Sequence, residues 1–345
     1  MRDGSRMGEI EMRFGLFGGP ARLPTDPGDQ TAYRNYLNAV IEADRLGYDG
    51  AYLVEHHFTG QGQVSASLSL LSHLAALTKQ IRLGTAVVVV PWHNPVLLAE
   101  QAATVDLLSG GRLDLGLGRG YRDYEFEGFG VDRAEANSRF SETLEFLRTA
   151  WTQEGRFDFS GEHWSFKNVV IEPRPLQTPH PPLWTGAASQ ASIEFAATQG
   201  LRLFLDQIAT FDEIEQRVKW YRAAQAAAGH PNTPNDIALT RPLLLTDKRH
   251  TREALLTSHL QTMERLASTA RSDRNPFYSN PDERKLRAEN GAVLGDAQEC
   301  IERIQRIAEC GVSTILFTRT PPNALRHFAD QVMPAFSNAA SSIRN

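Results

Sequence analysis

Cysteine is nearly absent from this chain, since its 345 residues include only Cys300 and Cys310. Both fall within one predicted helix, ten residues apart, so they leave the helix on different sides and are too far apart to form a disulfide. The sequence therefore has no disulfide framework and no cysteine metal site. Such usage is typical of a reducing compartment and predicts a cytoplasmic protein.

Long apolar runs are lacking too. The longest, residues 86–91, is far shorter than the ~20 residues of a membrane span and is typical of a buried strand. Residues 1–12 carry several charges and no apolar core, so we predict a flexible extension, not a signal peptide. An excess of basic charge is also missing. The net charge of −5 at pH 7 argues against a general nucleic-acid binder but leaves a local basic pocket possible.

Strand-like and helix-like segments alternate along the chain. The predicted strands are residues 14–17, 50–54, 81–90, 113–117, 183–186, 201–205, 237–245 and 313–317. The predicted helices are residues 32–46, 66–78, 95–108, 136–151, 190–198, 212–227, 297–308 and 324–336. Eight strands, each followed by a helix, are the content of an α/β fold of the (β/α)₈ TIM-barrel type. We therefore predict a single domain over residues 1–345.

Two segments interrupt this alternation. Residues 157–182 are rich in aromatic residues and proline, which predicts a β-hairpin inserted before the fifth strand. Residues 246–285 are polar and contain one helical stretch, 252–266, after the seventh strand. Long inserts in a compact barrel are usually functional, so we interpret the second as a lid. Neither is a separate domain, because the eighth strand follows.

An acid and two histidines, Glu55, His56 and His57, directly follow the second predicted strand. The carboxyl ends of barrel strands are where such enzymes place their catalytic residues. Histidine exchanges a proton near neutral pH, and a neighbouring carboxylate shifts the pKa of its imidazole. A shared metal ion is disfavoured, because adjacent side chains on extended backbone point to opposite sides. For a lone histidine, simple packing at the strand end is the alternative.

Two further strand ends are suited to an anion. Arg119 stands among glycines after the fourth strand, where a guanidinium could bind phosphate or form a structural ion pair. Tyr121 occupies the third glycine position of a dinucleotide fingerprint, so that interpretation is rejected. After the fifth strand, Ser189 and Ser192 begin a helix, and a helix start attracts anions. Ser189 can equally be an ordinary N-cap.

Several motifs in order resemble the bacterial luciferase-like family of flavin-dependent monooxygenases. They are residues 53–58 (LVEHHF), 81–91 (IRLGTAVVVVP), 110–120 (GGRLDLGLGRG), 126–132, 137–139 (NSR) and 186–192. Together they extend the resemblance from residue 12 to about residue 336. Their number and order are specific for the family but not for a substrate. The resemblance implies a (β/α)₈ barrel that forms a homodimer and takes reduced FMN from a separate NAD(P)H:flavin reductase.

The resemblance also implies roles for single residues. His56 would transfer protons beside the flavin, with Glu55 next to it, and Glu125 would lie near the flavin edge. A cis peptide at Ala86–Val87 would lie under the isoalloxazine ring. Arg119, Arg139, Ser189 and Ser192 would hold the flavin phosphate. Gly118, Gly186 and Ala188 would also belong to the cofactor-binding site. The light-emitting members carry a cysteine at the position of Gly118 and a carboxylate at that of Ala188, which argues against bioluminescence here.

From this resemblance we expect a monooxygenase that forms a flavin C4a-hydroperoxide with molecular oxygen and oxygenates a small apolar organic substrate. The aromatic residues near strand ends are the candidate substrate contacts: Phe17, Trp92, Tyr124 and Phe126. Trp184 is interpreted as core. A hydride-transfer oxidoreductase that uses deazaflavin F420 is one alternative, and the LVEHHF motif favours FMN over it. A flavin-binding protein without catalysis is the other alternative.

Overall fold

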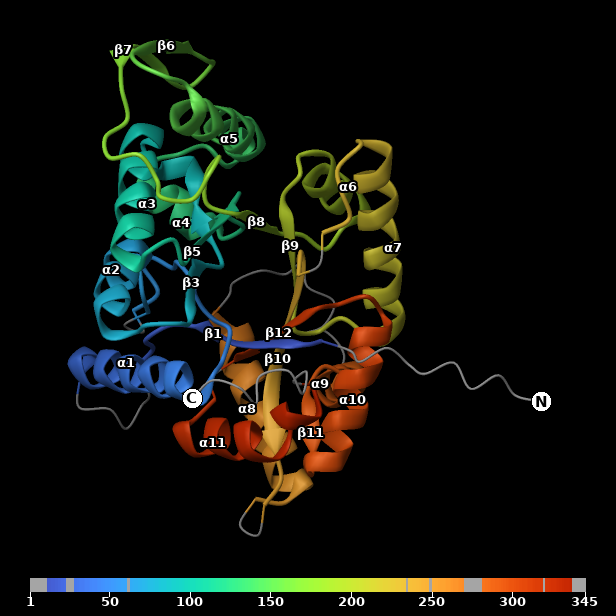
Figure 1. Ribbon diagram of the computed structural model, residues 1–345. Helices are drawn as coiled ribbons and strands as arrows, with labels where there is room; N and C mark the ends of the chain where they lie inside the picture. Colours follow the sequence, from blue (N-terminus) through green and yellow to red (C-terminus); the bar gives the residue numbers. More distant parts are fainter. Residues whose placement is uncertain are drawn as a thin grey trace.

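The computed structural model describes residues 11–22, 28–60, 63–233, 235–247, 250–269, 281–318 and 320–336. Its centre is a closed barrel of eight parallel strands, β1 (Arg13–Gly18), β2 (Gly50–Leu53), β3 (Arg82–Thr85), β5 (Leu113–Gly118), β8 (Leu183–Gly186), β9 (Arg202–Leu205), β10 (Ile237–Leu245) and β12 (Thr314–Thr318). Each pairs with the next, and β12 pairs with both β10 and β1 (Figure 1). The predicted (β/α)₈ barrel is confirmed.

Helices cover the outside of this barrel (Figure 1). They are α1 (Asp29–Leu46), α2 (Ser67–Leu77), α3 (Pro95–Ser109), α5 (Ala136–Thr152), α6 (Gln190–Thr198), α7 (Phe211–Ala227), α10 (Ala297–Glu309) and α11 (Pro322–Gln331). Local sequence sets the bounds of α3. The Asn94 side chain accepts the free amides of Val96 and Leu97, Pro95 needs no amide partner, and Gly110 ends the helix in the left-handed conformation at φ 67°.

The predicted strand 81–90 is wrong as one continuous element. It consists of β3, a cis peptide at Ala86–Val87, the short strand β4 (Val88–Val89) paired with β5, and the 3₁₀ turn η1 (Val90–Trp92). A run of β-branched residues indicates burial on both faces but does not show where hydrogen bonding stops. The cis peptide lies where the resemblance implies it.

The final predicted helix, 324–336, is also too long. It ends at Gln331 and is followed by the 3₁₀ turn η4 (Met333–Ala335). Pro334 has no amide hydrogen to continue the α-helical bonding. Two elements at the barrel mouth were not predicted, namely α4 (Asp123–Phe129) and the 3₁₀ turn η2 (Arg133–Glu135).

Additional elements lie outside the eight βα units. The antiparallel hairpin β6 (Phe157–Ser160) and β7 (Ser165–Val169) lies between α5 and β8. Helices α8 (Arg252–Thr269) and α9 (Pro281–Asn290) and the strand β11 (Val293–Gly295) lie between β10 and α10. The predicted extension falls mainly on residues 1–10, which lie outside the described residues, as do residues 248–249 and 270–280 of the predicted lid. Among the described helices, none has the length and apolar content to cross a membrane.

The barrel interior is filled by a compact cluster of side chains from five strands: Tyr52, Trp184, Phe204, Ala238 and Leu316. Phe17, Ala86 and Val87 are partly buried and pack against this cluster. The interpretation of Trp184 as core is confirmed, since it is buried and stacks on Phe204. The barrel is therefore a packed core and not a pore, with Ala86 and Val87 at its edge.

Candidate active site

A buried carboxylate gathers two histidines and a tryptophan just beyond β2. Glu55 is 2% exposed, and its Oε1 lies 3.1 Å from His57 Nε2, 2.9 Å from His93 Nε2 and 3.0 Å from Trp92 Nε1. An ionised carboxylate only accepts hydrogen bonds, so all three nitrogens must carry hydrogen. Trp92 and His93 come from η1 and the residue after it. Glu55 therefore ties the end of β2 to the turn after β4.

These contacts also set the ionisation of Glu55. Burial raises the pKa of its carboxyl, but the hydrogen bonds from His57, His93 and Trp92 outweigh burial and leave the pKa below its ordinary value. Glu55 is therefore an anion at neutral pH. A buried anion of this kind is suited to orienting its neighbours, and less so to donating a proton itself.

His56 lies on the other side of the strand end, toward α4. Its Nδ1 is 3.4 Å from Glu125 Oε1, which is close enough for charge interaction but too long for a well-formed hydrogen bond. Burial lowers the pKa of His56, and Glu125 offsets this only in part. The imidazole is therefore neutral at neutral pH. A neutral, largely buried histidine beside a carboxylate can accept a proton at one nitrogen while the other is held.

Glu125 was expected near a flavin edge, and the structure turns its carboxylate toward the histidines. It is 1% exposed, accepts the backbone amide of His57 at 2.9 Å, and lies 3.7 Å from the guanidinium of Arg122. Glu55 and Glu125 thus hold the segment His56–His57 from two sides. Among the described residues, no group of His, Cys, Asp or Glu side chains is arranged to hold a metal ion.

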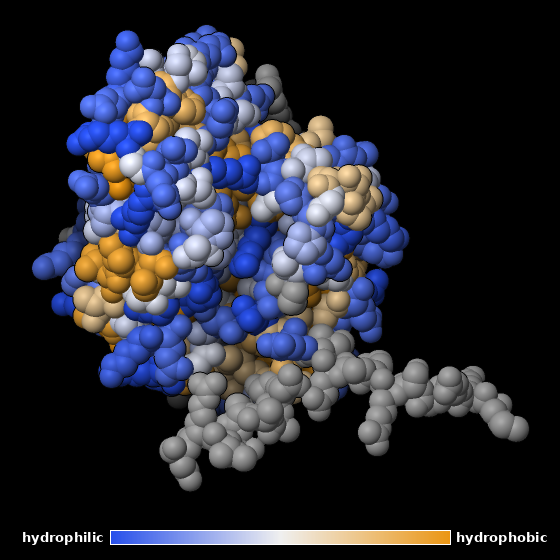
Figure 2. Space-filling view, turned by 45° about the horizontal axis from the view of Figure 1, so that its top comes forward, coloured by the Kyte–Doolittle hydropathy of each residue, from blue (hydrophilic) through white to orange (hydrophobic). Residues whose placement is uncertain are grey.

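Arg119 is placed as an anion-binding residue would be. Its guanidinium lies over the rings of Phe140 from α5 and Phe195 from α6, at 5.2 and 4.9 Å from their centroids. No carboxylate of the described residues pairs with it, and burial alone lowers its pKa. A half-buried cation without a counter-ion favours a bound anion over a structural ion pair. The surface is hollowed between the part that carries α5 and the part that carries α6 and α7 (Figure 2).

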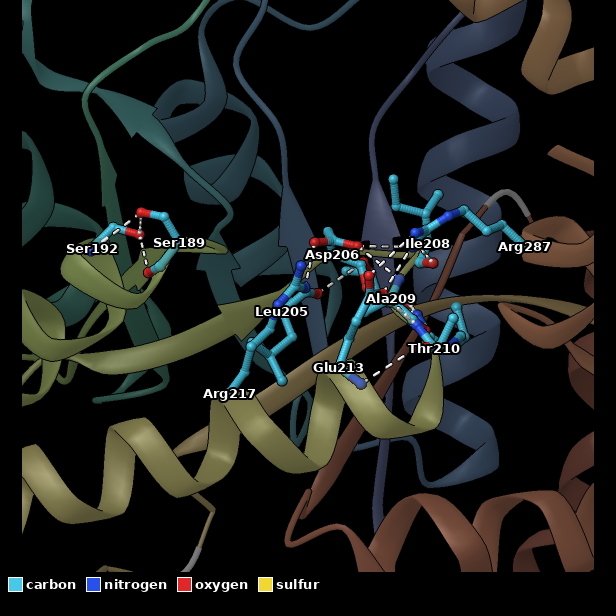
Figure 3. A network of polar contacts seen from close by, with 12 residues as sticks. Ser189, Ser192, Leu205, Asp206, Ile208, Ala209, Thr210, Glu213, Arg217 and Arg287 are labelled. Atoms are coloured by element: carbon cyan, nitrogen blue, oxygen red, sulfur yellow. Dashed lines mark hydrogen bonds and ion pairs between the residues drawn. The ribbon is translucent and has the colours of Figure 1, made fainter. Parts of the chain in front are cut away.

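The other expected phosphate contacts lie nearby on the same two helices. Ser189 caps α6 by accepting the amide of Ser192, and the two hydroxyls are 2.9 Å apart. Figure 3 shows the two side chains side by side at the start of the helix. The N-cap interpretation of Ser189 is thus confirmed, and Ser189 is exposed while Ser192 is partly buried. Gly186 and Ala188 in the preceding turn are exposed as well. Arg139, near the start of α5, is engaged by Glu135 at 2.8 Å and is only partly exposed.

Gly118 allows a close approach between β5 and the segment after β3. A Cβ atom on Gly118 would lie 2.2 Å from Cγ2 of Val87. Any side chain at position 118 therefore displaces Val87, which rests on the interior cluster together with Ala86. The absence of the family's cysteine at this position fits that packing.

The four expected substrate contacts are distributed unevenly. Trp92 is committed to Glu55 and stacks on Phe129 at 4.9 Å, and Phe126 is 2% exposed beneath it. Tyr124 accepts a hydrogen bond from Arg122 at 2.8 Å, and Phe17 is partly buried against the interior cluster. Only Phe17 and Tyr124 therefore combine partial exposure with no role in the Glu55 contacts.

Three residues of the site were not predicted: His93, Arg122 and Phe129. His93 follows an apolar run, and no residue near it in the sequence indicates that it contacts Glu55. Arg122 had a detectable signal, since tyrosines at positions 121 and 124 flank an arginine close to the candidate acid Glu125. Aromatic rings around an arginine are typical of a guanidinium held in place.

Comparison with known proteins gives a consistent result. A family model described as luciferase-like monooxygenase matches residues 12–314. The oxygenase component of the flavin-dependent trigonelline monooxygenase of Acinetobacter baylyi is 27% identical over 95% of this chain and 96% of that protein. The crystal structure of the monooxygenase RslO1 from Streptomyces bottropensis superposes with a TM-score of 0.83 at 28% identity, covering 94% of this chain and all of that one.

Two more distant structures show the fold alone. The oxygenating constituent of 3,6-diketocamphane monooxygenase from Pseudomonas putida, in complex with FMN, has a TM-score of 0.77 at 18% identity, covering 94% of this chain and 99% of that one. An F420-dependent secondary alcohol dehydrogenase also has a TM-score of 0.77, at 15% identity, covering 95% and 100%. The fold thus occurs with either type of cofactor.

Proposed function

Because this chain belongs to the luciferase-like monooxygenase family, a family of flavin-dependent oxidoreductases, we propose that it is the oxygenase of a two-component system. It takes reduced FMN from a separate NAD(P)H:flavin reductase and inserts one atom of molecular oxygen into a small apolar organic substrate. The relative from Acinetobacter baylyi, an oxygenase component, supports the two-component organisation. The observation that carries the proposal is the guanidinium of Arg119, which is half-buried between two rings and has no counter-ion among the residues that the structure describes.

Arg119 holds the FMN phosphate in this proposal, with Ser189, Ser192 and the more distant Arg139 around it. The hydroxyls of Ser189 and Ser192 at the start of α6 supply donors, and the helix terminus adds favourable dipole character. Gly186 and Ala188 leave the phosphate room in the preceding turn. Gly118, Ala86 and Val87 form a packed edge of the barrel that would support a bound ring system. Reduced FMN, when bound, supplies the electrons that activate oxygen.

The chain's own residues supply proton management and exclusion of water. The imidazole of His56 is neutral, so it can accept a proton from the bound reactants and return it to them. The carboxylate of Glu125 lies opposite Nδ1 of His56. Glu55 remains anionic and holds His57 and the turn η1 in place, so the residues beside His56 keep their positions. Phe17 and Tyr124 offer partly exposed aromatic surface to an apolar substrate. The described part of the predicted lid, residues 246–247, 250–269 and 281–285, would cover the site.

Arg119→Met tests this proposal. Methionine keeps apolar contact with Phe140 and Phe195 but removes the charge, so the free energy of unfolding in urea should change by no more than about 0.5 kcal/mol. Affinity for reduced FMN, measured anaerobically by fluorescence titration, should fall about tenfold or more, which corresponds to the loss of about 1.4 kcal/mol. Reduced riboflavin lacks the phosphate and serves as the control ligand. Its affinity should stay the same.

If Arg119→Met lost the same affinity for reduced FMN and for reduced riboflavin, Arg119 would not bind the phosphate. Tighter binding of F420 than of FMN, with substrate turnover in the absence of oxygen, would replace the proposal by hydride transfer. Retained flavin with neither oxygen consumption nor turnover across apolar substrates would indicate a binding protein without catalysis.

We also propose a homodimer through α2 and α3, which pack against each other. The exposed positions of α3 recur at helical spacing as Leu97, Gln101, Thr104 and Leu108, and Leu77 is exposed at the end of α2. Leu108 is 59% exposed and Leu97 55%. A stripe with two exposed leucines and no charge is typical of a helix face that a partner covers.

A further inference from the structure

Arg122 lies between β5 and α4 and has no part in the cofactor contacts proposed above. It donates hydrogen bonds to the hydroxyls of Tyr124 at 2.8 Å and Tyr121 at 3.2 Å. Its guanidinium also lies over both rings, 5.9 and 5.4 Å from their centroids. The side chain is only 13% exposed. An arginine held by two rings and two hydroxyls has a fixed position, because its long side chain has lost its rotameric freedom.

This fixed cation acts on the surroundings of His56. Its NH1 atom is 3.7 Å from Glu125 Oε1, the oxygen that lies 3.4 Å from His56 Nδ1 and accepts the amide of His57. The ring of Tyr121, which Arg122 holds, stands edge-on to the imidazole of His56 with centroids 6.5 Å apart at 90°. Arg122 therefore contacts both the carboxylate and the aromatic ring that flank His56.

We propose that Arg122 is a positioning residue for His56. It fixes Glu125 and Tyr121 about the imidazole, so that Nδ1 is directed at the carboxylate and Nε2 remains for the reacting proton. This inference rests on the proposed role of His56 in proton transfer. It adds a residue that does not touch the cofactor phosphate and acts only through the neighbours of His56.

The charges around His56 determine in which direction its pKa should change when Arg122 is replaced. Glu125 from α4 and Glu55 from the end of β2 favour the imidazolium form, while burial and the charge of Arg122 oppose it. His57 and His93 lie beyond Glu55 and contact its carboxylate, and Tyr121 and Tyr124 contact Arg122. Removing the guanidinium leaves two carboxylates facing His56 without the opposing cation. The pKa of His56 must then rise.

The test uses the full chain without flavin, so its outcome does not depend on which cofactor is bound. The imidazole of His56 is titrated by NMR, with its resonance assigned from His56→Gln. In Arg122→Gln its pKa should move upward. The control is Arg133→Gln. Arg133 is an exposed arginine after α4 that pairs with the exposed Asp123, and its replacement should leave the titration unchanged. Arg122→Lys retains the charge and should keep the titration near that of the native protein.

A second readout separates positioning from a merely structural role. In Arg122→Gln, kcat for oxygenation should fall about tenfold, and affinity for reduced FMN should stay within twofold of the native value. Arg122→Lys should recover part of kcat. An unshifted titration of His56 in Arg122→Gln would overturn the inference. So would loss of FMN affinity equal to that of Arg119→Met, because Arg122 would then be a cofactor ligand.

Discussion

Replacing Glu55 by glutamine removes one negative charge and changes almost nothing in shape. The charged carboxylate of Glu55 accepts hydrogen bonds from three N–H donors. They belong to His57, His93 and Trp92, and all three lie 2.9–3.1 Å from Oε1. The site is 2% exposed, so water does not replace the lost charge. Glutamine can still accept through its carbonyl oxygen, but only as a neutral group. The change therefore isolates the contribution of ionisation.

The expected loss follows from the difference between charged and neutral acceptors. A hydrogen bond to a charged group contributes about 1.5–3 kcal/mol, and a neutral one about 0.5–1.5 kcal/mol. Three donors that share one oxygen are not fully additive, so the free energy of unfolding should fall by about 2–4 kcal/mol at pH 7. Urea unfolding followed by tryptophan fluorescence measures it. Glu127→Gln, an exposed carboxyl on α4, is the matched control and should change stability by less than about 0.5 kcal/mol.

The pH dependence gives an independent check. The pKa of Glu55 is lowered in the folded protein, so the unfolded chain binds its proton first as the pH falls. The stabilisation from Glu55 is therefore complete above the unfolded pKa of about 4.3 and is lost as the pH drops through the folded pKa. The native protein and Glu55→Gln should differ most near neutral pH and converge in acid. Equal stability at pH 7, or a difference that does not shrink in acid, would refute the reasoning.

Three other predictions concern packing, a buried cation and assembly. Gly118→Ala should lower the free energy of unfolding in urea by about 1–3 kcal/mol, because the added Cβ meets Val87. In a Val87→Ala background this loss should largely vanish, and additive losses in the double mutant would contradict the prediction. Arg241→Met should cost about 2–4 kcal/mol, because its guanidinium is buried on backbone carbonyls of residues 206, 209 and 240, and a thermal melt unchanged from the native protein would contradict it. Leu108→Glu should convert a dimer to a monomer in sedimentation velocity, whereas Leu286→Glu on α9 should not; a monomeric native protein would end the dimer proposal.

Much of the barrel could be predicted because the signals were local. All eight barrel strands were located, since each is a short apolar run followed by a stretch with helical spacing. The break at Ala86–Val87 was not visible as a break in the pattern, because Val87 to Val90 are alike in sequence and differ only in backbone path. It was expected from the resemblance alone. The short helix α4 was missed because seven residues contain too few turns to show a period.

The positions of the candidate site residues were predictable from the sequence, and their contacts were less so. The pattern indicated His56 and Arg119 correctly as residues at strand ends, because the carboxyl ends of the strands share one face of the barrel. Which groups meet there depends on distances across the mouth. His93 reaches Glu55 from 38 positions further along the chain, and Glu125 reaches the amide of His57 from 68. No local pattern encodes such pairs, so the contacts of Glu125 with His56 and His57 could not be read from the sequence.

Closure of the barrel has a consequence for biosynthesis. The first strand, β1, obtains its second neighbour only from β12, where Arg13 faces Thr314. A ribosome that adds roughly 5–20 residues per second needs about 15–60 s to make the roughly 300 residues between them. Throughout that time the outer edge of β1 offers unpaired backbone groups to any other nascent strand. The yield of active protein in a cell therefore depends on how well that edge is shielded until translation is almost finished.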